Sequence, residues 1–196
     1  GEFVKILQDR GYQATGIDPY EDAIKVANEH FGLHMQGGFY TARAYGAEEF
    51  DLITAECVVY RFEHVDTFFG AAWKHLRLGG YLFLVIPDVH LVQLNFLTNS
   101  VRCLFVPENI ETLLGSRYFR LVSILSSVSS PGAFQPGVFG VLAQKVASQS
   151  LHSGFVNKLD RLTAYRSLLK QDYGLIRSRP VHPVAVTLLK FLDDWG

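Results

Sequence analysis

Residues 50–88 carry the clearest pattern of apolar and polar positions in the chain. An apolar run at Leu52 and Ile53 stops at polar residues, and a second run over residues 81–86 stops at Pro87. Between the runs, apolar residues recur at three- and four-residue spacing, which predicts a helix that Gly79 and Gly80 end. Strand, helix and strand in this length predict a βαβ unit with parallel neighbouring strands. Neither run alternates, as expected of strands covered on both faces.

The residues before this unit predict a helix, a strand and a second helix. The first helix covers residues 2–10 and ends at Gly11, and the strand covers residues 12–17. The second helix covers residues 20–30, ends at Gly32 and has a narrow apolar face of Ala23, Val26 and Ala27. Residues 33–36 predict a weak further strand. The chain therefore alternates strands and helices, which is typical of an α/β fold.

The residues after the unit predict a connection, a hairpin and a helical extension. Residues 90–106 form a long connection with an apolar helical pattern, and a short helix follows over residues 110–114. Residues 119–125 and 138–146 are predicted strands, joined by a segment rich in turn formers. A polar linker begins at residue 148, and two amphipathic helices are predicted to follow it. We therefore expect a domain over residues 1–147 and a helical extension over residues 148–196.

Composition narrows the classes of partner. Net charge is −1 and 19% of the 196 residues are charged, with basic residues scattered, which does not favour a nucleic-acid partner. No apolar run reaches the roughly 18 residues that a membrane span needs. The two cysteines, Cys57 and Cys103, lie far apart without the spacing of a zinc site. Two cysteines favour a reducing, cytoplasmic setting, and we expect Cys57 to serve packing.

Three stretches resemble one family in the order in which that family carries them. FDLI at residues 50–53, a helix, and LRLGGYLFLVIPD at residues 76–88 resemble the middle of class I S-adenosylmethionine-dependent methyltransferases. GYQATGIDPYEDAIKVANEHFG resembles the family's second strand with its acidic residue and next helix, and PENIETLLGSRYFRLVSI resembles the segment before its last strands. The resemblance covers residues 1–147. It implies a Rossmann-like, mostly parallel sheet with helices on both faces and a C-terminal antiparallel hairpin.

The resemblance also places Gly1 in the family's pattern. The family's first strand runs into a glycine-rich loop of the form G-x-G-x-G, and Gly1 matches the last of these glycines. We therefore expect the first strand and most of the loop to precede Gly1. The alternative is a domain that works without them.

S-adenosylmethionine is the cofactor that the resemblance implies. Asp18, followed by Pro19, ends the second strand, where a carboxylate can accept hydrogen bonds from ribose hydroxyls. The alternative for Asp18 is a helix cap. The family often has an acidic residue near the adenine, and this chain offers Gln36 there, with Phe39 as a candidate for the adenine face. Glu56 follows the next strand, at the edge where cofactor and substrate meet.

His64 is the candidate catalytic residue. The relatives that the chain resembles most begin the next helix with a Glu-His pair, and a gap-free register puts Tyr60 and Arg61 there. Glu63 and His64 come three residues later, nearly one helical turn. His64 could act as a general base on a substrate hydroxyl. The alternative is a polar helix start, with Glu63 near the positive end of the helix dipole.

Three functions are compatible with these residues. The resemblance predicts S-adenosylmethionine-dependent methyl transfer to a small-molecule acceptor, without a metal. A non-catalytic domain of the same fold, used for binding or assembly, is the alternative. A nicotinamide-dependent dehydrogenase would also place Asp18 at a ribose, and would require a parallel last strand. The two C-terminal helices are expected to pack on the domain or to form a homodimer or interdomain contact.

Overall fold

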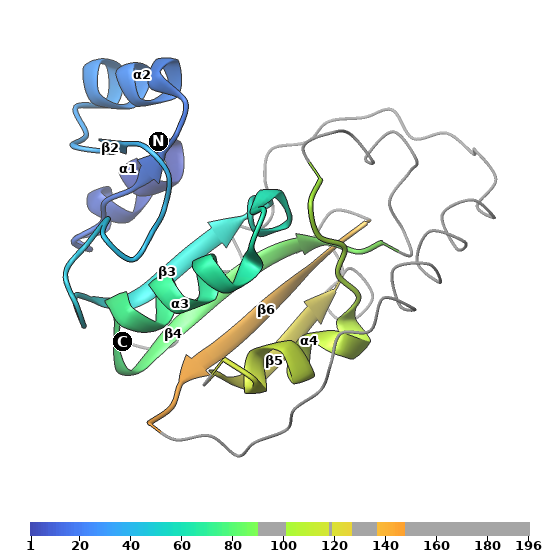
Figure 1. Ribbon diagram of the computed structural model, residues 1–196. Coiled ribbons are helices and arrows are strands. Elements are labelled where there is room, and N and C mark those ends of the chain that lie inside the picture. The colour runs from blue at the N-terminus through green and yellow to red at the C-terminus, as the bar shows by residue number, and fades with distance from the viewer. Residues whose placement is uncertain (90–100, 118, 127–136, 148–196) are drawn as a thin grey trace, which may run out of the picture. The chain divides into compact units, whose positions relative to one another are not determined.

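The computed structural model describes residues 1–89, 101–117, 119–126 and 137–147 (Figure 1). Contacts divide the chain into two compact units, residues 1–44 and residues 45–196. The predicted boundary at residue 148 stays a prediction, because the helical extension lies outside the described residues. The same holds for residues 90–100, where the sequence predicts part of a helical connection.

The first unit contains a two-stranded parallel sheet. Its elements are α1 (Glu2–Asp9), β1 (Ile17–Asp18), α2 (Glu21–Phe31) and β2 (Gln36–Gly37). Ile17 pairs with Gln36, and Asp18 pairs with Gly37. The predicted strand over residues 12–17 was too long at its start, because only Ile17 and Asp18 have ladder partners among the described strands. Helix α2 ends at Gly32 as predicted, and Gly32 has a left-handed φ of 66°.

The apolar face of α2 differs from the predicted one. Ala27 is buried, but Val26 is 54% exposed and Ala23 is exposed, while Ile24 is half-buried. Asn28 is also half-buried. Its side-chain amide donates to the Met35 carbonyl and accepts the Met35 N–H. The spacing of apolar residues therefore misplaced this face by about one residue, because a polar side chain supplies part of the contact.

The second unit contains a four-stranded mixed sheet. Its elements are β3 (Phe50–Glu56), η1 (Val59–Arg61), α3 (Val65–His75), β4 (Leu76–Pro87), α4 (Pro107–Gly115), β5 (Phe119–Ser126) and β6 (Val138–Lys145). The strand order is β3-β4-β6-β5. Strands β3 and β4 are parallel, whereas β6 is antiparallel to both β4 and β5. The predicted βαβ unit and the predicted antiparallel hairpin are both confirmed.

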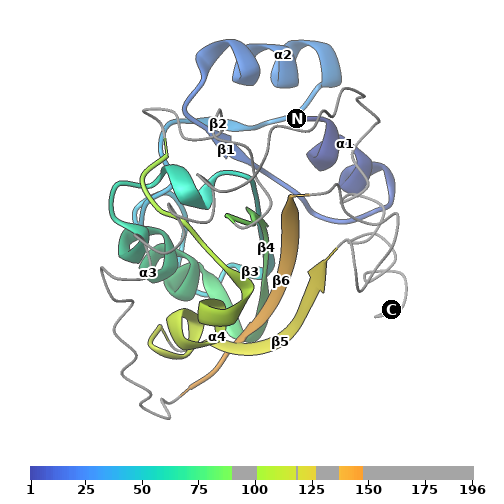
Figure 2. The ribbon, with the colours of Figure 1, turned by 90° about the vertical axis from the view of Figure 1, so that its right-hand side faces the viewer.

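Helix α3 packs against the sheet through an aromatic side chain, and α4 buries the aliphatic residues Ile110, Leu113 and Leu114. Figures 1 and 2 show α3 and α4 on the same face of this sheet. Phe69 of α3 and Phe119 of β5 are buried, with ring centroids 6.2 Å apart. Strand β4 is buried on both faces, since Leu82, Phe83 and Leu84 are each 4% exposed or less. This is the expected environment of a central strand without alternation, and the Rossmann-like α/β class is confirmed.

The edge of the described sheet has a bulge. In β5, Leu121 pairs with Ala143 and Ser123 pairs with Leu142, so Val122 has no partner of its own in β6. Val122 is 47% exposed. Two residues of β5 therefore oppose one residue of β6, which is the arrangement of a β-bulge.

Helix α3 ends four residues before the predicted glycines. His75 is its last residue, Leu76 is already extended, and Gly79 and Gly80 belong to β4. The reason lies in a distant segment: the Glu48 N–H donates to the Lys74 carbonyl at 2.9 Å, and the Glu49 N–H donates to the His75 carbonyl at 2.8 Å. These donors satisfy carbonyls that a helix end leaves without partners, so no glycine cap is needed at His75.

Gly79 and Gly80 instead shape an irregular start of β4. Between two pairs of the ladder, Phe50 with Leu76 and Leu52 with Tyr81, β3 advances two residues and β4 advances five. Gly79 has a φ of 81°. A Cβ at Gly80 would lie 2.9 Å from the Arg77 carbonyl oxygen, so only glycine fits the tight return of the chain.

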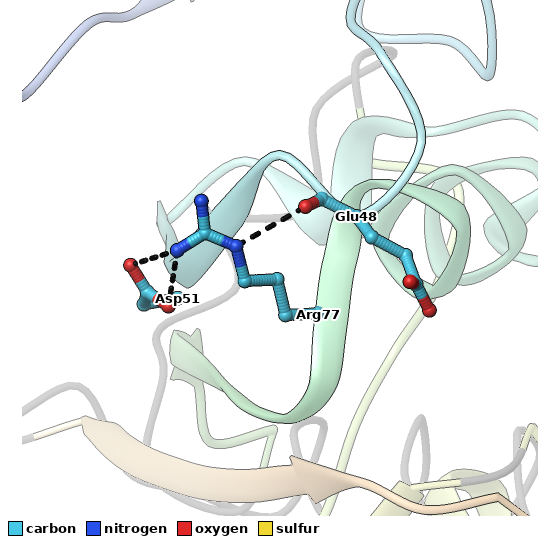
Figure 3. Close-up of polar contacts among 3 residues, drawn as sticks. All are labelled: Glu48, Asp51 and Arg77. Atoms are coloured by element: carbon cyan, nitrogen blue, oxygen red, sulfur yellow. Dashed lines mark hydrogen bonds and ion pairs between the residues drawn. The ribbon is translucent and has the colours of Figure 1, made fainter.

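Arg77 and Lys145 fix this end of the second unit. Arg77 donates from Nη1 to both carboxylate oxygens of Asp51 at 2.7 Å, and from Nε to the Glu48 carbonyl at 3.2 Å (Figure 3). Lys145, 3% exposed, donates from Nζ to the Leu76 carbonyl at 2.7 Å. Its Nζ also lies 3.4 Å from Glu48 Oε1 and 4.2 Å from the Trp73 ring centroid. The buried ammonium group is thereby paired on several sides, as its burial requires.

We predict that Lys145→Met destabilises the protein by about 1–3 kcal/mol, because the buried Leu76 carbonyl loses a charged donor while the methylene packing is kept. Urea unfolding followed by circular dichroism measures the effect. Lys25→Met, at an exposed position of α2, is the matched control and should leave the midpoint unchanged. Equal midpoints for both variants would contradict the prediction.

Candidate functional site at the strand ends

Asp18 lies at the carboxyl end of β1 and ties together the turns that follow both strands of its sheet. Its Oδ1 accepts the Tyr20 N–H at 2.8 Å, and its carbonyl accepts the Gly38 N–H at 2.9 Å. The residue at the N-cap of α2 is Tyr20, so Asp18 forms a turn before the helix and is not its cap. Oδ2 has no hydrogen-bond partner in the described part of the chain. Oδ2 of this half-buried carboxylate could accept a further hydrogen bond, and the ribose-binding role of Asp18 stays a prediction.

Gly1 lies where a side chain would collide with α2. A Cβ at Gly1 would stand 2.7 Å from the Ala27 Cβ and 3.2 Å from Leu33 Cδ1. The Gly1 carbonyl accepts the Lys5 N–H at 3.0 Å, so this glycine directly precedes the first turn of α1. In dinucleotide-binding folds, one loop glycine is needed for this kind of close packing. The cofactor-binding role that the resemblance gives to Gly1 stays a prediction.

The other candidates of the first unit lie at the same strand ends. Gln36 is exposed, and its backbone N–H donates to the Gly16 carbonyl at 2.9 Å. Pro19 is exposed directly after Asp18. Phe39 is 75% exposed, so it has almost no packing role within its unit. These residues are near neighbours of the paired positions Asp18 and Gly37.

Glu56 and Cys57 end β3 in the second unit. Glu56 is exposed, and Cys57 has a left-handed φ of 52°, which is uncommon for a residue other than glycine. The Cys57 N–H donates to the Val85 carbonyl at 2.9 Å, which holds this conformation. Burial raises the pKa of the Cys57 thiol from 9.0 to about 11, with a further increase from Glu56 and a decrease from Arg61. The thiol therefore stays protonated at neutral pH.

His64 is exposed and precedes α3. Its backbone is the N-cap of the helix, and its carbonyl accepts the Thr67 N–H at 3.0 Å. The described structure gives its ring no hydrogen-bond partner that would orient it. Neither the general base nor the polar helix start is decided by this placement, so the role of His64 stays a prediction.

Tyr60 and Arg61 form a contact that sequence reasoning did not find. They lie in η1, and Tyr60 is only 7% exposed. The Arg61 guanidinium carbon is 5.5 Å from the Tyr60 ring centroid, and Arg61 Nε donates to the Tyr60 hydroxyl at 3.3 Å. The register had placed this pair where relatives carry Glu-His, which was the one signal in the sequence that could have singled it out.

Residues 1–89, 101–117, 119–126 and 137–147 contain no group of three or more His, Cys, Asp or Glu side chains that could hold a metal ion. None of their helices has the length and apolar character needed to cross a membrane. Neither Cys57 nor Cys103 forms a disulfide.

Residues 1–125 match the family described as "Methyltransferase domain". The chain belongs to this methyltransferase family. The match covers the helices and strands from α1 to most of β5 and confirms the resemblance that the three sequence stretches indicated. None of the curated proteins compared with the chain matches it.

Solved structures of methyltransferases share the fold. The S-adenosylmethionine-dependent methyltransferase of Archaeoglobus fulgidus is 16% identical, with a TM-score of 0.60 over 74% of this chain and 81% of that one. The Methanosarcina mazei enzyme of the same description is 16% identical, with a TM-score of 0.57 over 73% and 86% of the two chains.

A third solved structure contains a product of the cofactor. The 1,6-didemethyltoxoflavin-N1-methyltransferase of Burkholderia thailandensis, with its substrate and S-adenosylhomocysteine bound, is 15% identical. Its TM-score is 0.54 over 72% of this chain and 65% of that one. Together with the family match, these neighbours support S-adenosylmethionine as the cofactor, as the sequence predicted.

We predict that Cys57 is slow to alkylate in the folded protein. At pH 8, a pKa of about 11 lowers the thiolate fraction roughly a hundredfold relative to the ordinary thiol. Iodoacetamide labelling of a Cys103→Ala variant, with the same variant in urea as its reference, measures the rate. From pH 9 to pH 10 the native rate should still rise about tenfold, whereas the unfolded reference levels off. Parallel pH profiles would contradict the raised pKa.

Proposed function

We propose that this methyltransferase domain transfers a methyl group from S-adenosylmethionine to a small-molecule acceptor. The family match over residues 1–125 carries the proposal. The Burkholderia thailandensis neighbour, which binds a small heterocyclic substrate, supports the class of acceptor. The antiparallel β6 speaks against the dehydrogenase, which would need a parallel last strand.

Four residues of the first unit would hold the cofactor. Asp18 offers Oδ2 to the ribose hydroxyls, and Gly1, directly before α1, would lie beside the cofactor as the resemblance implies. Pro19 and Gln36 flank the ends of β1 and β2, with Gln36 proposed for the adenine. When bound, the cofactor supplies the reactive methyl group on its sulfonium sulfur. The protein's contribution is chiefly position and orientation.

Two residues of the second unit are proposed for the reaction. Glu56 would contribute to cofactor binding from the end of β3. His64 would accept a proton from an acceptor hydroxyl, and its exposure before α3 leaves the imidazole open to solvent and substrate. We place the reaction in the cytoplasm, supported by the two free thiols. The C-terminal helices are proposed to form a homodimer or interdomain contact.

The alternative is a domain of this family that binds or assembles without catalysis. The register of the sequence resemblance favours it, because that register puts Tyr60 and Arg61 at the expected Glu-His pair, and these two residues contact each other. Such a domain would bind S-adenosylmethionine weakly or not at all, and would release no S-adenosylhomocysteine. Turnover therefore separates the two proposals.

We predict that Asp18→Asn weakens S-adenosylmethionine binding about tenfold or more, because a carboxylate acceptor of ribose hydroxyls is lost. Asparagine keeps an oxygen for the Tyr20 N–H, so the local turn should survive. Isothermal titration calorimetry with S-adenosylmethionine measures the affinity. Asp22→Asn, an exposed acid in the first turn of α2, is the control and should bind like the parent protein.

No heat of binding for the parent protein at millimolar S-adenosylmethionine would count against the enzyme. If Asp18→Asn binds S-adenosylmethionine as tightly as the parent protein, Asp18 is not part of the cofactor site, although the protein still binds the cofactor. Binding without release of S-adenosylhomocysteine in the presence of acceptors would favour the non-catalytic domain.

A further inference from the structure

The first unit has little buried surface of its own. Across residues 1–44, all of which the structure describes, only Ala27 and Leu33 are buried. Helix α1 buries none of its residues, and β1 and β2 share a ladder of two residue pairs. Because burial of apolar surface is the dominant favourable term in folding, this unit gains little stability from its own packing.

Much of the apolar surface of the first unit stays in water. Its exposed large apolar side chains are between 38% and 75% exposed, and they are Ile6, Tyr12, Tyr20, Val26 and Phe39. Only the area that leaves water contributes to the hydrophobic free energy. The unit therefore obtains only part of the stabilisation that its apolar composition could provide.

Other supports of this unit are weak as well. The Gln8 side-chain amide donates to the Ala14 carbonyl at 2.8 Å, at an exposed position where water competes for both groups. Cys57 and Cys103 lie in the second unit, so no disulfide can form within the first. Domains shorter than about 40 residues usually need a disulfide, a metal or a partner, and a unit of 44 residues lies close to that limit.

The second unit has the opposite character. Strand β4 lies between β3 and β6, and its residues Leu82, Leu84 and Ile86 are each 0% exposed. Phe139 and Val141 of β6 are also 0% exposed. Local opening of a protein costs little free energy where few contacts are buried, and much more in a well-packed core. The burial within each unit therefore predicts that the two units open at different free energies.

We infer that the first unit unfolds locally while the second unit stays folded, and that S-adenosylmethionine bound at the ends of β1 and β2 suppresses this opening. The separate opening follows from the first unit's own burial. Its control by the cofactor rests on the proposed function, which assigns Gly1, Asp18, Pro19 and Gln36 to cofactor binding. All four residues belong to the first unit.

The coupling follows from mass action. A ligand that binds only the folded first unit lowers the population of its opened form, by about a hundredfold when the ligand concentration is about one hundred times Kd. By the same linkage, any change that opens the unit lowers the apparent affinity for the ligand in proportion to the folded fraction that remains. Folding of residues 1–44 and cofactor binding are then linked equilibria.

Hydrogen–deuterium exchange of the full 196-residue chain, measured by mass spectrometry of peptic peptides, tests both halves of the inference. Without ligand, we expect protection factors in α2 to be at least roughly tenfold lower than in β4 and β6. With S-adenosylmethionine at about one hundred times its Kd, exchange in α2 should slow by up to about a hundredfold. Equal protection in α2 and β4 without ligand would show one cooperative transition and overturn the inference. Unchanged exchange in α2 at saturating ligand would overturn its second half.

Leu33→Ala tests the opening through the core of the first unit. It removes most of one of the two buried side chains, so exchange in α2 should quicken at least roughly tenfold. Exchange in β4 and β6 should stay nearly unchanged, even where the variant opens the first unit completely. Val26→Ala is the matched control, because Val26 is 54% exposed on α2, and its exchange should resemble that of the parent protein. Loss of protection in β4 and β6 with Leu33→Ala would mean that the units unfold together, which contradicts the inference.

Calorimetry with S-adenosylmethionine separates this inference from the proposed function. Leu33→Ala should weaken binding by the factor by which it lowers the folded fraction of the first unit, whereas Val26→Ala should bind like the parent protein. Binding to the parent without slower exchange in α2 defeats the control by the cofactor alone. No binding to the parent defeats the proposed function and that control with it, and exchange of the ligand-free protein then still decides whether the first unit opens separately.

Discussion

The second unit depends on one set of hydrogen bonds, in which distant donors bind the backbone carbonyls at the end of α3. The backbone N–H groups of Glu48 and Glu49 meet the carbonyls of Lys74 and His75, and the buried Lys145 meets the carbonyl of Leu76. Buried carbonyls without donors cost free energy comparable to a lost hydrogen bond. These contacts tie the segment before β3, the turn from α3 into β4 and the last residue of β6 to one place. The opposite end of the sheet, where β3 ends at Glu56, is thereby built on a fixed base.

Periodicity predicted the elements whose pattern is set by local burial. The apolar runs of β3 and β4 and the helical spacing of α3 are recovered, because each reflects side chains that pack on a sheet. The predicted end of α3 was wrong because the donors to its last carbonyls come from Glu48, Glu49 and Lys145. No local sequence pattern connects these residues to His75. The predicted start of β1 was wrong because a strand extends only as far as it has a partner strand to pair with.

The residues of the candidate site likewise divide into those that the sequence predicted and those that it could not predict. Asp18 was predicted from its place after a strand, and Gly1 from the family's order of motifs, and their roles stay predictions. The left-handed backbone of Cys57 could not be predicted, since cysteine has no preference for that region. The contact of the Tyr60 carbonyl with the Arg102 and Cys103 N–H groups was hidden as well, because it joins backbone segments separated by the whole of α3 and β4. The sequence thus predicts which residues follow the strands, and tertiary contacts decide which of these residues lie close together.

The bulge at Val122 has a consequence for self-association. An outer strand with regular, unpaired amides is a template on which another polypeptide can extend the sheet. The extra residue in β5 interrupts the even spacing of donors and acceptors and increases the local twist. An incoming strand could match the register on one side of Val122 only. Among the described strands, the outer border of β5 is therefore a poor template for amyloid-like growth.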